Sequence, residues 1–355
     1  MDIAKETKLI SNYIIGLRKY FHRYPELSMQ EYNTSKKIKE ELDRIGIRYE
    51  EGVKTEVVAS IGKGEGRTIA LRADMDALSI EENTGVRYSS ENKGVMHACG
   101  HDAHMASLIG AAMILKKYEE NLLGKIILIF QPSEENSLGA KLISEQGYLD
   151  DVDEIFGLHV FGDIECGKIS IEEGPRMAAS NKFRIKVTGK AGHIKSGDTH
   201  NIISGEAIIE GTVRSFKVST AKHIQQSIKR VAYSTAIAYG ATATVEYDIS
   251  NHPAVINDSE AVKTALEGAK KIFKEEDIIS VPRMMLGEDF SIYQKSIPGV
   301  FAFVGASNED IGIDYPNHND KFNIDEKAIL ISTELYVAYA LEALKKEVRR
   351  HVFRH

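Results

Sequence analysis

The run Ile126-Ile127-Leu128-Ile129-Phe130 is apolar without interruption and leads directly into Gln131-Pro132-Ser133-Glu134-Glu135-Asn136. An apolar run of this length is typical of a strand that is buried on both faces of a sheet. Further short runs rich in apolar residues occupy residues 57–61, 68–73 and 154–160. Together these strands predict an α/β domain whose central sheet is mostly parallel and flanked by helices.

Helical periodicity surrounds the predicted strands. Apolar residues recur every three or four positions over residues 2–23 and 31–45, and these segments close at Pro25 and Gly46. Further helices are predicted at residues 106–117, 258–273 and 325–349, of which the last is amphipathic.

A glycine cluster, Gly62-Lys63-Gly64-Glu65-Gly66, separates the strands at residues 57–61 and 68–73. The cluster lacks the Lys-Ser/Thr pair of a phosphate-binding loop, and it precedes a strand rather than a helix. We therefore interpret it as the turn of a hairpin between the two strands.

Composition and charge exclude several classes of function. Hydrophobic content of 43% and charged content of 27% are ordinary for a soluble globular protein, and no apolar run approaches a membrane span. The net charge of −7 and a pI near 6.0, without a basic stripe, argue against nucleic acid as a partner. The charged N-terminus does not resemble a signal peptide, and Cys99 and Cys166 alone make no disulfide framework. We therefore expect a cytoplasmic protein with no membrane or nucleic-acid partner.

The length of 355 residues exceeds one typical domain, so we expect a main domain and a smaller one. The smaller domain is an α+β satellite in the middle of the chain, where half-exposed strands accompany one helix. Its strands are predicted at residues 183–187, 206–214 and 242–247, and its helix at residues 221–239. We place this satellite domain at residues 181–254 and the catalytic domain at residues 1–180 and 255–355.

The stretch Met96-His97-Ala98-Cys99-Gly100-His101-Asp102-Ala103-His104 packs one cysteine, three histidines and one aspartate into nine positions. Thiolate and imidazole groups are natural ligands of a borderline-soft divalent metal. Cys99 and His101 are expected just before a helix, whose N-terminus helps to keep a thiolate ionised and is capped by Asp102. The stretch therefore predicts part of a metal site.

Acidic residues follow two of the predicted strands, as the pair Asp74 and Asp76 and the pair Glu134 and Glu135. Carboxylates at such strand ends often face the binding crevice of an α/β sheet. Either aspartate could orient a metal-bound imidazole, and of two adjacent glutamates one can ligate metal while the other acts as a general base. His159, near the end of a further strand, counts only as part of this set, because a lone strand histidine is more often structural.

Taken together, these motifs resemble the dinuclear metal amidohydrolases and peptidases. That family includes hippurate hydrolases, N-acyl-amino-acid and N-acetyldiaminopimelate deacetylases, and auxin-conjugate hydrolases. The resemblance covers nearly the whole chain. Its motifs are Leu71-Arg72-Ala73-Asp74-Met75-Asp76-Ala77-Leu78, His97-Ala98-Cys99-Gly100-His101-Asp102, Gln131-Pro132-Ser133-Glu134-Glu135, Gly157-Leu158-His159-Val160, Gly174-Pro175-Arg176-Met177-Ala178, Gly287-Glu288-Asp289-Phe290 and Pro316-Asn317-His318 with Phe322.

The resemblance implies a site for two divalent metal ions, Zn²⁺ or Mn²⁺, with Co²⁺ and Ni²⁺ also suited to the donors. It implies Glu134 as the general base and Asp76 as a partner that steadies the site. No ligand role carries over to His97 or His104, which we expect to be hydrogen-bonded histidines lining the same crevice. The implied protein ligands are Cys99, as a thiolate that bridges the two ions, and His101, Glu135, His159 and His318.

The implied reaction is hydrolysis of the linear amide bond of a small N-acyl amino acid. A metal-bridged hydroxide attacks the amide carbonyl, and Glu134 takes the proton of the water and returns it to the departing amine. An aminopeptidase or carboxypeptidase of the same family, acting on short peptides, shares this chemistry and stays open as an alternative. A cysteine hydrolase with Cys99 as nucleophile also stays open, as does a non-catalytic family member with an altered lid.

In the family the satellite domain is a lid that also mediates homodimerisation, and a Gly-His motif in it steadies the oxyanion of the intermediate. The resemblance therefore implies substrate-binding roles for His193 and for Asn201 in the loop that follows. Relatives place a helix and a strand after the Gly-His motif, whereas here only Ile194-Lys195-Ser196 separate His193 from Gly197-Asp198-Thr199. Either the lid is shortened in this protein or a piece of it is missing from this sequence.

Overall fold

The computed structural model of the chain describes residues 1–190 and 205–347, which divide into two compact units. The larger unit consists of Met1–Arg176, Ile256–Pro282 and the chain from Ile292 onward. The smaller unit consists of Met177–Val255 and Arg283–Ser291, so a short segment far along the chain returns to it.

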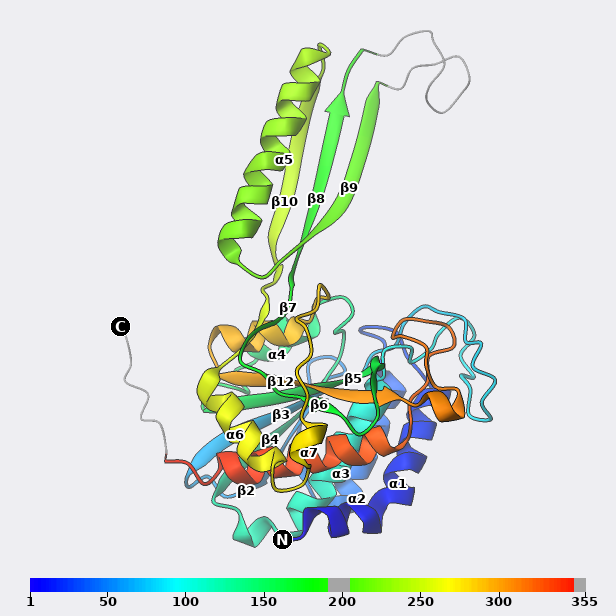
Figure 1. Cartoon of the computed structure of the whole chain (residues 1–355), viewed down its shortest axis with the longest axis vertical. Coiled ribbons are helices and arrows are strands. Elements are labelled where there is room, and N and C mark those ends of the chain that lie inside the picture. The colour runs from blue at the N-terminus through cyan, green and yellow to red at the C-terminus, as the bar shows by residue number, and fades with distance from the viewer. Residues whose placement is uncertain (191–204, 348–355) are drawn as a thin grey trace. The chain divides into compact units, whose positions relative to one another are not determined.

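A seven-stranded sheet forms the centre of the larger unit (Figure 1). Its inner strands β4, β3, β5 and β12 are parallel neighbours, whereas antiparallel pairs join β1 to β2, β2 to β4 and β6 to β12. The predicted α/β class with a mostly parallel sheet is therefore confirmed. In spatial order the strands are β1 (Arg48–Glu51), β2 (Val57–Gly62), β4 (Gly124–Gln131), β3 (Arg67–Asp74), β5 (Glu154–Glu165), β12 (Gly299–Ser307) and β6 (Ile169–Ser170).

The predicted hairpin between β2 and β3 is wrong, although both strands exist. β4 lies between them, antiparallel to β2 and parallel to β3. The glycine cluster passes close to the backbone at the start of β4. A Cβ atom at Gly62 would lie 2.3 Å from the carbonyl oxygen of Gly124, and a Cβ atom at Gly66 would lie 2.2 Å from the carbonyl oxygen of Leu123. Both glycines also have positive φ, at 93° and 100°. The glycines thus serve a close backbone crossing rather than a tight turn.

Helices pack against this sheet and against one another (Figure 1). The helix α7 contacts α1, α3, α6 and the strands β3, β5 and β12, and is buried over most of its surface. Its predicted amphipathic character is therefore wrong, because neighbours cover it on several sides. The helices of this unit are α1 (Ile3–Arg23), α2 (Tyr32–Ile45), α3 (His101–Lys117), α4 (Gly139–Glu145), α6 (Ser259–Ala269) and α7 (Lys327–Ala343).

The smaller unit is an antiparallel sheet with one helix. The sheet has the order β10 (Thr242–His252), β8 (Ala179–Thr188), β9 (Glu206–Ser215), and α5 (Val218–Ala238) contacts all three strands. The predicted strands and helix of the satellite domain are thus found.

A separate two-stranded sheet joins β7 (Gly174–Met177) to β11 (Val255–Asn257). Among the described residues, no helix has the length and apolar character needed to span a membrane.

Candidate functional site

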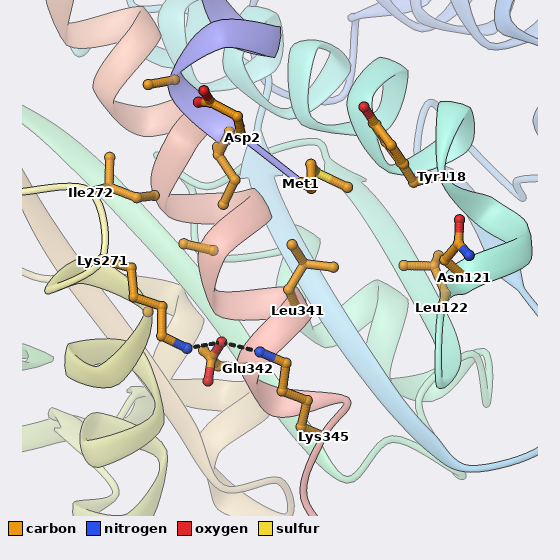
Figure 2. A pocket seen from close by; sticks show the side chains of 14 residues that line it. Met1, Asp2, Tyr118, Asn121, Leu122, Lys271, Ile272, Leu341, Glu342 and Lys345 are labelled. Atoms are coloured by element: carbon orange, nitrogen blue, oxygen red, sulfur yellow. Dashed lines mark hydrogen bonds and ion pairs between the residues drawn. The ribbon is translucent and has the colours of Figure 1, made fainter.

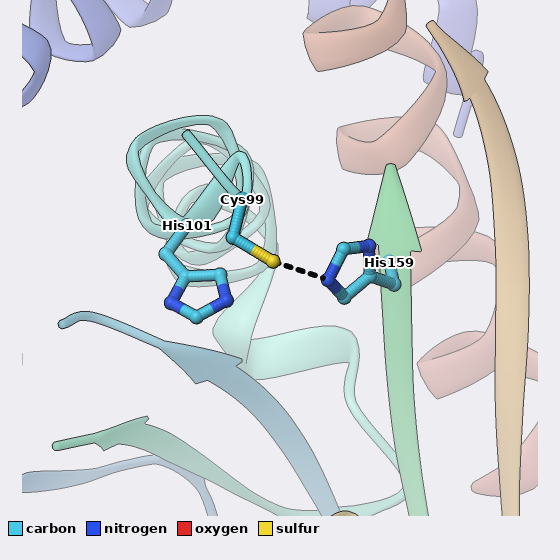
Figure 3. Close-up of side chains that lie close together, drawn as sticks. All are labelled: Cys99, His101 and His159. Carbon is cyan, nitrogen blue, oxygen red and sulfur yellow. Dashed lines mark hydrogen bonds between the residues drawn. The ribbon is translucent and has the colours of Figure 1, made fainter. Parts of the chain in front are cut away.

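Three predicted ligands, Cys99, His101 and His159, converge above the carboxyl end of the sheet (Figure 3). Cys99 precedes α3, His101 is the first residue of that helix, and His159 lies within β5. All three side chains are buried, their ligand atoms lie within 4.8 Å of one another, and Cys99 Sγ is 3.3 Å from His159 Nε2. Gly100 makes the arrangement possible, because its φ is 94° and a Cβ there would lie 2.4 Å from the side chain of Val160.

A second group of ligand atoms shares Cys99 with the first. It contains Glu135, from the loop after β4, and His318, from the loop that precedes α7. His318 Nε2 lies 3.2 Å from Cys99 Sγ and 3.5 Å from Glu135 Oε1. The side chain of His318 is 53% exposed, so the site opens on this side. All five predicted ligands are therefore brought together in two overlapping groups.

Several observations fit a pair of divalent cations at this place. His101 Nε2 and Glu135 Oε1 are buried and have no hydrogen-bond partner among the described residues. Tetrahedral zinc sites with ordinary bond lengths hold sulfur and nitrogen ligands about 3.5 Å apart, close to the separations found around Cys99. Burial lowers the pKa of His101, but the carboxylates of Asp74 and Asp76 outweigh it and raise that pKa to about 10. The surroundings thus favour positive charge at the centre of the cluster.

The same surroundings oppose the ionised form of Cys99, which the helix N-terminus was expected to favour. Burial, with the carboxylates of Glu135 and Glu134, raises the pKa of the Cys99 thiol well above its ordinary value. A nearby cation is the group that would favour the thiolate.

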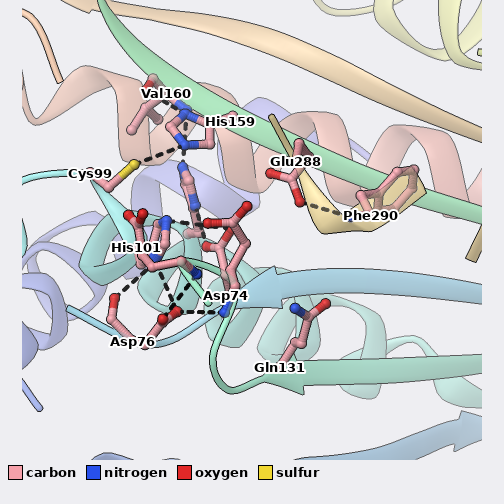
Figure 4. Close-up of polar contacts among 12 residues, drawn as sticks. Asp74, Asp76, Cys99, His101, Gln131, His159, Val160, Glu288 and Phe290 are labelled. Atoms are coloured by element: carbon pink, nitrogen blue, oxygen red, sulfur yellow. Dashed lines mark hydrogen bonds and ion pairs between the residues drawn. The ribbon is translucent and has the colours of Figure 1, made fainter. Parts of the chain in front are cut away.

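Asp76 contacts His101 (Figure 4) and also the loop that carries Glu134 and Glu135. Its backbone carbonyl accepts a hydrogen bond from His101 Nδ1 at 2.8 Å, which leaves Nε2 facing the cluster. Its carboxylate accepts hydrogen bonds from the backbone N–H groups of Glu134, at 3.0 Å, and Glu135, at 3.1 Å. The geometry therefore gives Asp76 the contacts expected of a residue that steadies the site.

The two histidines without an implied ligand role behave differently. His104 donates from Nδ1 to Asp74 at 2.6 Å, and its Nε2 accepts from the backbone N–H of Val160 at 2.9 Å, so its predicted hydrogen bonding is confirmed. For His97 the same prediction is wrong, because neither ring nitrogen has a partner among the described residues. Burial lowers the pKa of His97 to about 3, so its ring is held neutral.

Asp102 is not the predicted helix cap, since Gly100 occupies the N-cap position of α3. Its carboxylate accepts hydrogen bonds from Arg18 Nε and His22 Nδ1, each at 2.8 Å, and all three side chains are buried. Arg18 and His22 lie on the buried face of α1, one turn apart. A charged residue at a core position of a predicted helix was the signal that could have revealed this cluster.

Asn317 belongs to the motif Pro316-Asn317-His318, but the sequence did not reveal its contacts. Its side-chain amide donates to the carbonyls of Cys99, at 3.0 Å, and Val160, at 3.1 Å, and accepts from the N–H of Gly162 at 3.0 Å. These bonds fix Asn317, the residue directly before His318. The backbone of His318 has a positive φ of 69°. The predicted substrate residues His193 and Asn201 lie outside the described residues.

Residues 70–342 match the sequence pattern of peptidase family M20/M25/M40. The chain belongs to this family. It is 36% identical to thermostable carboxypeptidase 1 of Saccharolobus solfataricus, over 97% of this chain and 99% of that protein. It is 38% identical to N-acetyl-L-cysteine deacetylase of Bacillus subtilis, over 89% of this chain and 85% of that protein.

Solved structures agree with this membership. A dinuclear metal binding peptidase of the M20 family from Bacillus subtilis superposes with a TM-score of 0.86 at 33% identity, covering 95% of this chain and 99% of the other. The family acts on amide bonds, so this M20 chain is an amide hydrolase. The alignment with the carboxypeptidase is 395 positions long, so the relative holds residues that have no counterpart among the 355 of this chain.

A hollow of about 620 Å³ in the larger unit contains none of the predicted site residues (Figure 2). It is lined by the start of α1, the residues after α3 and parts of α6 and α7. Its cations Lys271 and Lys345 both form ion pairs with Glu342. The metal-ligand cluster is therefore the better candidate for the site of catalysis.

Proposed function

We propose that this M20 enzyme removes the acyl group from N-acyl amino acids. The observation that carries the proposal is the convergence of five candidate metal ligands, Cys99 and four others around it, with Glu134 beside them. The similarity to N-acetyl-L-cysteine deacetylase supports an N-acyl amino acid as the small-molecule substrate. The similarity to a carboxypeptidase supports the alternative, a peptidase that cleaves short peptides.

The proposed ligand roles follow the two overlapping groups. Cys99 would serve both metal ions, with His101 and His159 on one side and Glu135 and His318 on the other. Zn²⁺ and Mn²⁺ suit this mixture of sulfur, nitrogen and oxygen donors, and Co²⁺ and Ni²⁺ are further possibilities. When bound, such ions polarise a carbonyl oxygen and lower the pKa of water, which makes a nucleophile available near neutral pH.

Glu134 is the proposed general base. Its side chain is 9% exposed, and its carboxylate lies within 4.8 Å of the ligand atoms of His101 and Glu135. It would accept a proton from the attacking water and return it to the departing amine, which leaves as a neutral product. Asp76 accepts a hydrogen bond from the backbone N–H of Glu134 and so fixes the point from which the base extends.

The smaller unit is the proposed lid and dimerisation domain, with His193 and Asn201 as substrate-binding residues. Exposed apolar side chains support an association of two copies through this unit. Ile209, Val231 and Tyr239 are 53%, 55% and 85% exposed, and all three line an apolar hollow of about 660 Å³ beside α5. We place the enzyme in the cytoplasm, since both of its cysteines are free.

A substrate panel tests the proposal. The protein is loaded with Zn²⁺ or Mn²⁺ and assayed against acetyl, benzoyl and indole-acetyl amino acids alongside dipeptides. Faster turnover of N-acyl amino acids supports the deacylase, whereas faster turnover of dipeptides supports the peptidase. Activity that EDTA does not remove would support the cysteine hydrolase, and no turnover with two bound metals would support the non-catalytic family member.

A further inference from the structure

Two buried carboxylates hold the backbone of the loop that carries Glu134 and Glu135. Asp76 accepts the N–H groups of these two residues, and the N–H of Ser133 donates to Glu31 Oε1 at 2.9 Å. Three consecutive N–H groups of the loop are therefore bound by side chains from elsewhere in the chain. Neither the sequence motifs nor the family match assigns a role to Glu31.

The conformation of Ser133 depends on this support. Its φ is 55°, in the left-handed region that residues other than glycine adopt at a cost. Such a conformation persists when the surroundings fix it, and the N–H of Ser133 is the group that Glu31 holds. The turn at Ser133 sets the direction in which Glu134 and Glu135 leave β4, so a change at Ser133 would move both side chains.

Glu31 is fully buried and has hydrogen bonds on both carboxylate oxygens. Besides Ser133, the backbone N–H of Met29 donates to Oε1 at 2.9 Å, and the hydroxyl of Thr55 donates to Oε2 at 2.7 Å. None of these partners is a cation. Burying a carboxylate in this way is costly, so it indicates a requirement for the acceptor at this position.

The segment between α1 and α2 reaches the loop a second time. The hydroxyl of Ser28 donates to Asp76 Oδ2 at 2.7 Å, and Asp76 in turn binds Glu134 and Glu135. A segment about 100 residues before the loop thus supports it through Ser28 and Glu31. The bond from Ser28 to Asp76 is therefore a second link between this segment and the loop, separate from the bond between Glu31 and Ser133.

We propose that Glu31 is a positioning residue, which sets the places of Glu134 and Glu135 by holding the backbone N–H of Ser133. The inference rests on the proposed function, in which Glu134 is the base and Glu135 a metal ligand. Catalysis is sensitive to such placement, since a displacement of about 1 Å can cost roughly 10²-fold in rate.

Two substitutions separate hydrogen-bond geometry from charge. Glu31→Asp keeps the charge but shortens the reach toward Ser133, so kcat falls by about tenfold or more with little change in KM. Glu31→Gln keeps the length, because its carbonyl oxygen can accept from Ser133 and Met29 while its NH₂ group donates to Thr55. It therefore retains most of kcat. Burial raises the pKa of Glu31 to about 7, so its replacement by the neutral glutamine removes less charge near pH 7 than the replacement of an exposed glutamate would.

Glu26→Asp is the matched control. The carboxylate of Glu26 lies in the same segment and accepts from the N–H and side-chain groups of Asn33 and Thr34 at the start of α2, not from Ser133. Its shortening lowers the melting temperature, as Glu31→Asp also does, while kcat per folded molecule stays unchanged. A purely structural role of Glu31 would give Glu31→Asp the same behaviour as this control.

Amide hydrogen exchange gives a readout that needs no substrate. Exchange at residues 133–135 becomes faster in Glu31→Asp and stays slow in Glu31→Gln and Glu26→Asp. The proposal is overturned if Glu31→Asp keeps both its kcat and its slow exchange, or if Glu31→Gln loses as much kcat as Glu31→Asp.

The exchange measurement also separates this inference from the proposed function. If the wild-type enzyme hydrolyses none of the panel, the proposed function fails, and the exchange rates alone decide whether Glu31 holds the loop. If Glu31→Asp does not fold, Glu31→Gln decides: slow exchange with retained kcat supports the proposal, and a loss of kcat greater than tenfold overturns it.

Discussion

The imidazole Nε2 of His318 lies 3.2 Å from the Sγ of Cys99, although 219 positions separate the two residues in the chain. Asn317 stabilises this contact, because its side-chain amide donates a hydrogen bond to the backbone carbonyl of Cys99. The backbone N–H of His318 adds a hydrogen bond of 2.7 Å to the carbonyl of Ala98. The loop before α7 is thereby tied to the segment before α3, and Cys99 becomes the side chain shared by both groups of ligands.

Replacement of Cys99 by alanine should remove metal from both positions, since the thiolate is the proposed shared ligand. We expect metal content to fall from two ions per chain to fewer than one, and activity to fall with it, as measured by elemental analysis and substrate turnover. Cys166→Ala is the control, because Cys166 belongs to neither group of ligand atoms. A Cys99→Ala protein with two ions and full activity would contradict the bridging role.

The adjacent residues Glu134 and Glu135 should respond differently to the same substitution. Glu134→Gln removes the proposed base and should lower kcat by about 10²- to 10⁴-fold while both metal ions stay bound. Glu135→Gln removes a proposed ligand and should lower metal content instead. Parallel measurement of kcat and bound metal distinguishes the two roles, which would be refuted if both variants lost metal equally.

The strands were predictable from the local apolar pattern, whereas the full set of ligand candidates came from the resemblance to the family. The run at residues 126–130 forms β4, and the five ligand candidates converge as the family motifs imply. Strand pairing was not predictable in the same way, since apolar periodicity reports which faces are buried and not which strand lies alongside. The hairpin expected at Gly62–Gly66 was wrong for this reason.

Buried polar contacts between distant segments of the chain could not be predicted from the sequence either. Asp102 looked like a helix cap because of its place before an apolar helix, whereas its partners Arg18 and His22 lie more than 75 residues earlier. Glu31 carries no local signal, because nothing near it in sequence reveals that Ser133 and Thr55 lie beside it. Only the packed fold brings such pairs together.

Asn317→Ala should weaken metal binding without removing a ligand. Loss of its three hydrogen bonds frees the backbone before His318, and loss of such a supporting residue typically costs about 10- to 100-fold in metal affinity. Competition with a chromophoric chelator measures this affinity. Asn319→Ala serves as the control, because its side chain accepts a hydrogen bond from the backbone N–H of Lys321 in the same loop and, among the described residues, none from the segment before α3. Equal affinities of the two variants would refute the supporting role of Asn317.

His97 should make the protein sensitive to acid. Burial lowers its pKa to about 3 in the folded state, compared with about 6.5 for an unfolded chain, so the folded protein holds fewer protons between these values. The stability that depends on neutral His97 is therefore fully present above pH 6.5 and is lost as the pH falls toward 3. At pH 5 the loss amounts to about 2 kcal/mol, because each pH unit below 6.5 costs about 1.4 kcal/mol. His97→Gln cannot titrate and should show a smaller decrease in the free energy of unfolding between pH 7 and pH 5, measured by urea denaturation at fixed metal content. Parallel decreases in the wild-type and variant proteins would show that His97 is not the group responsible.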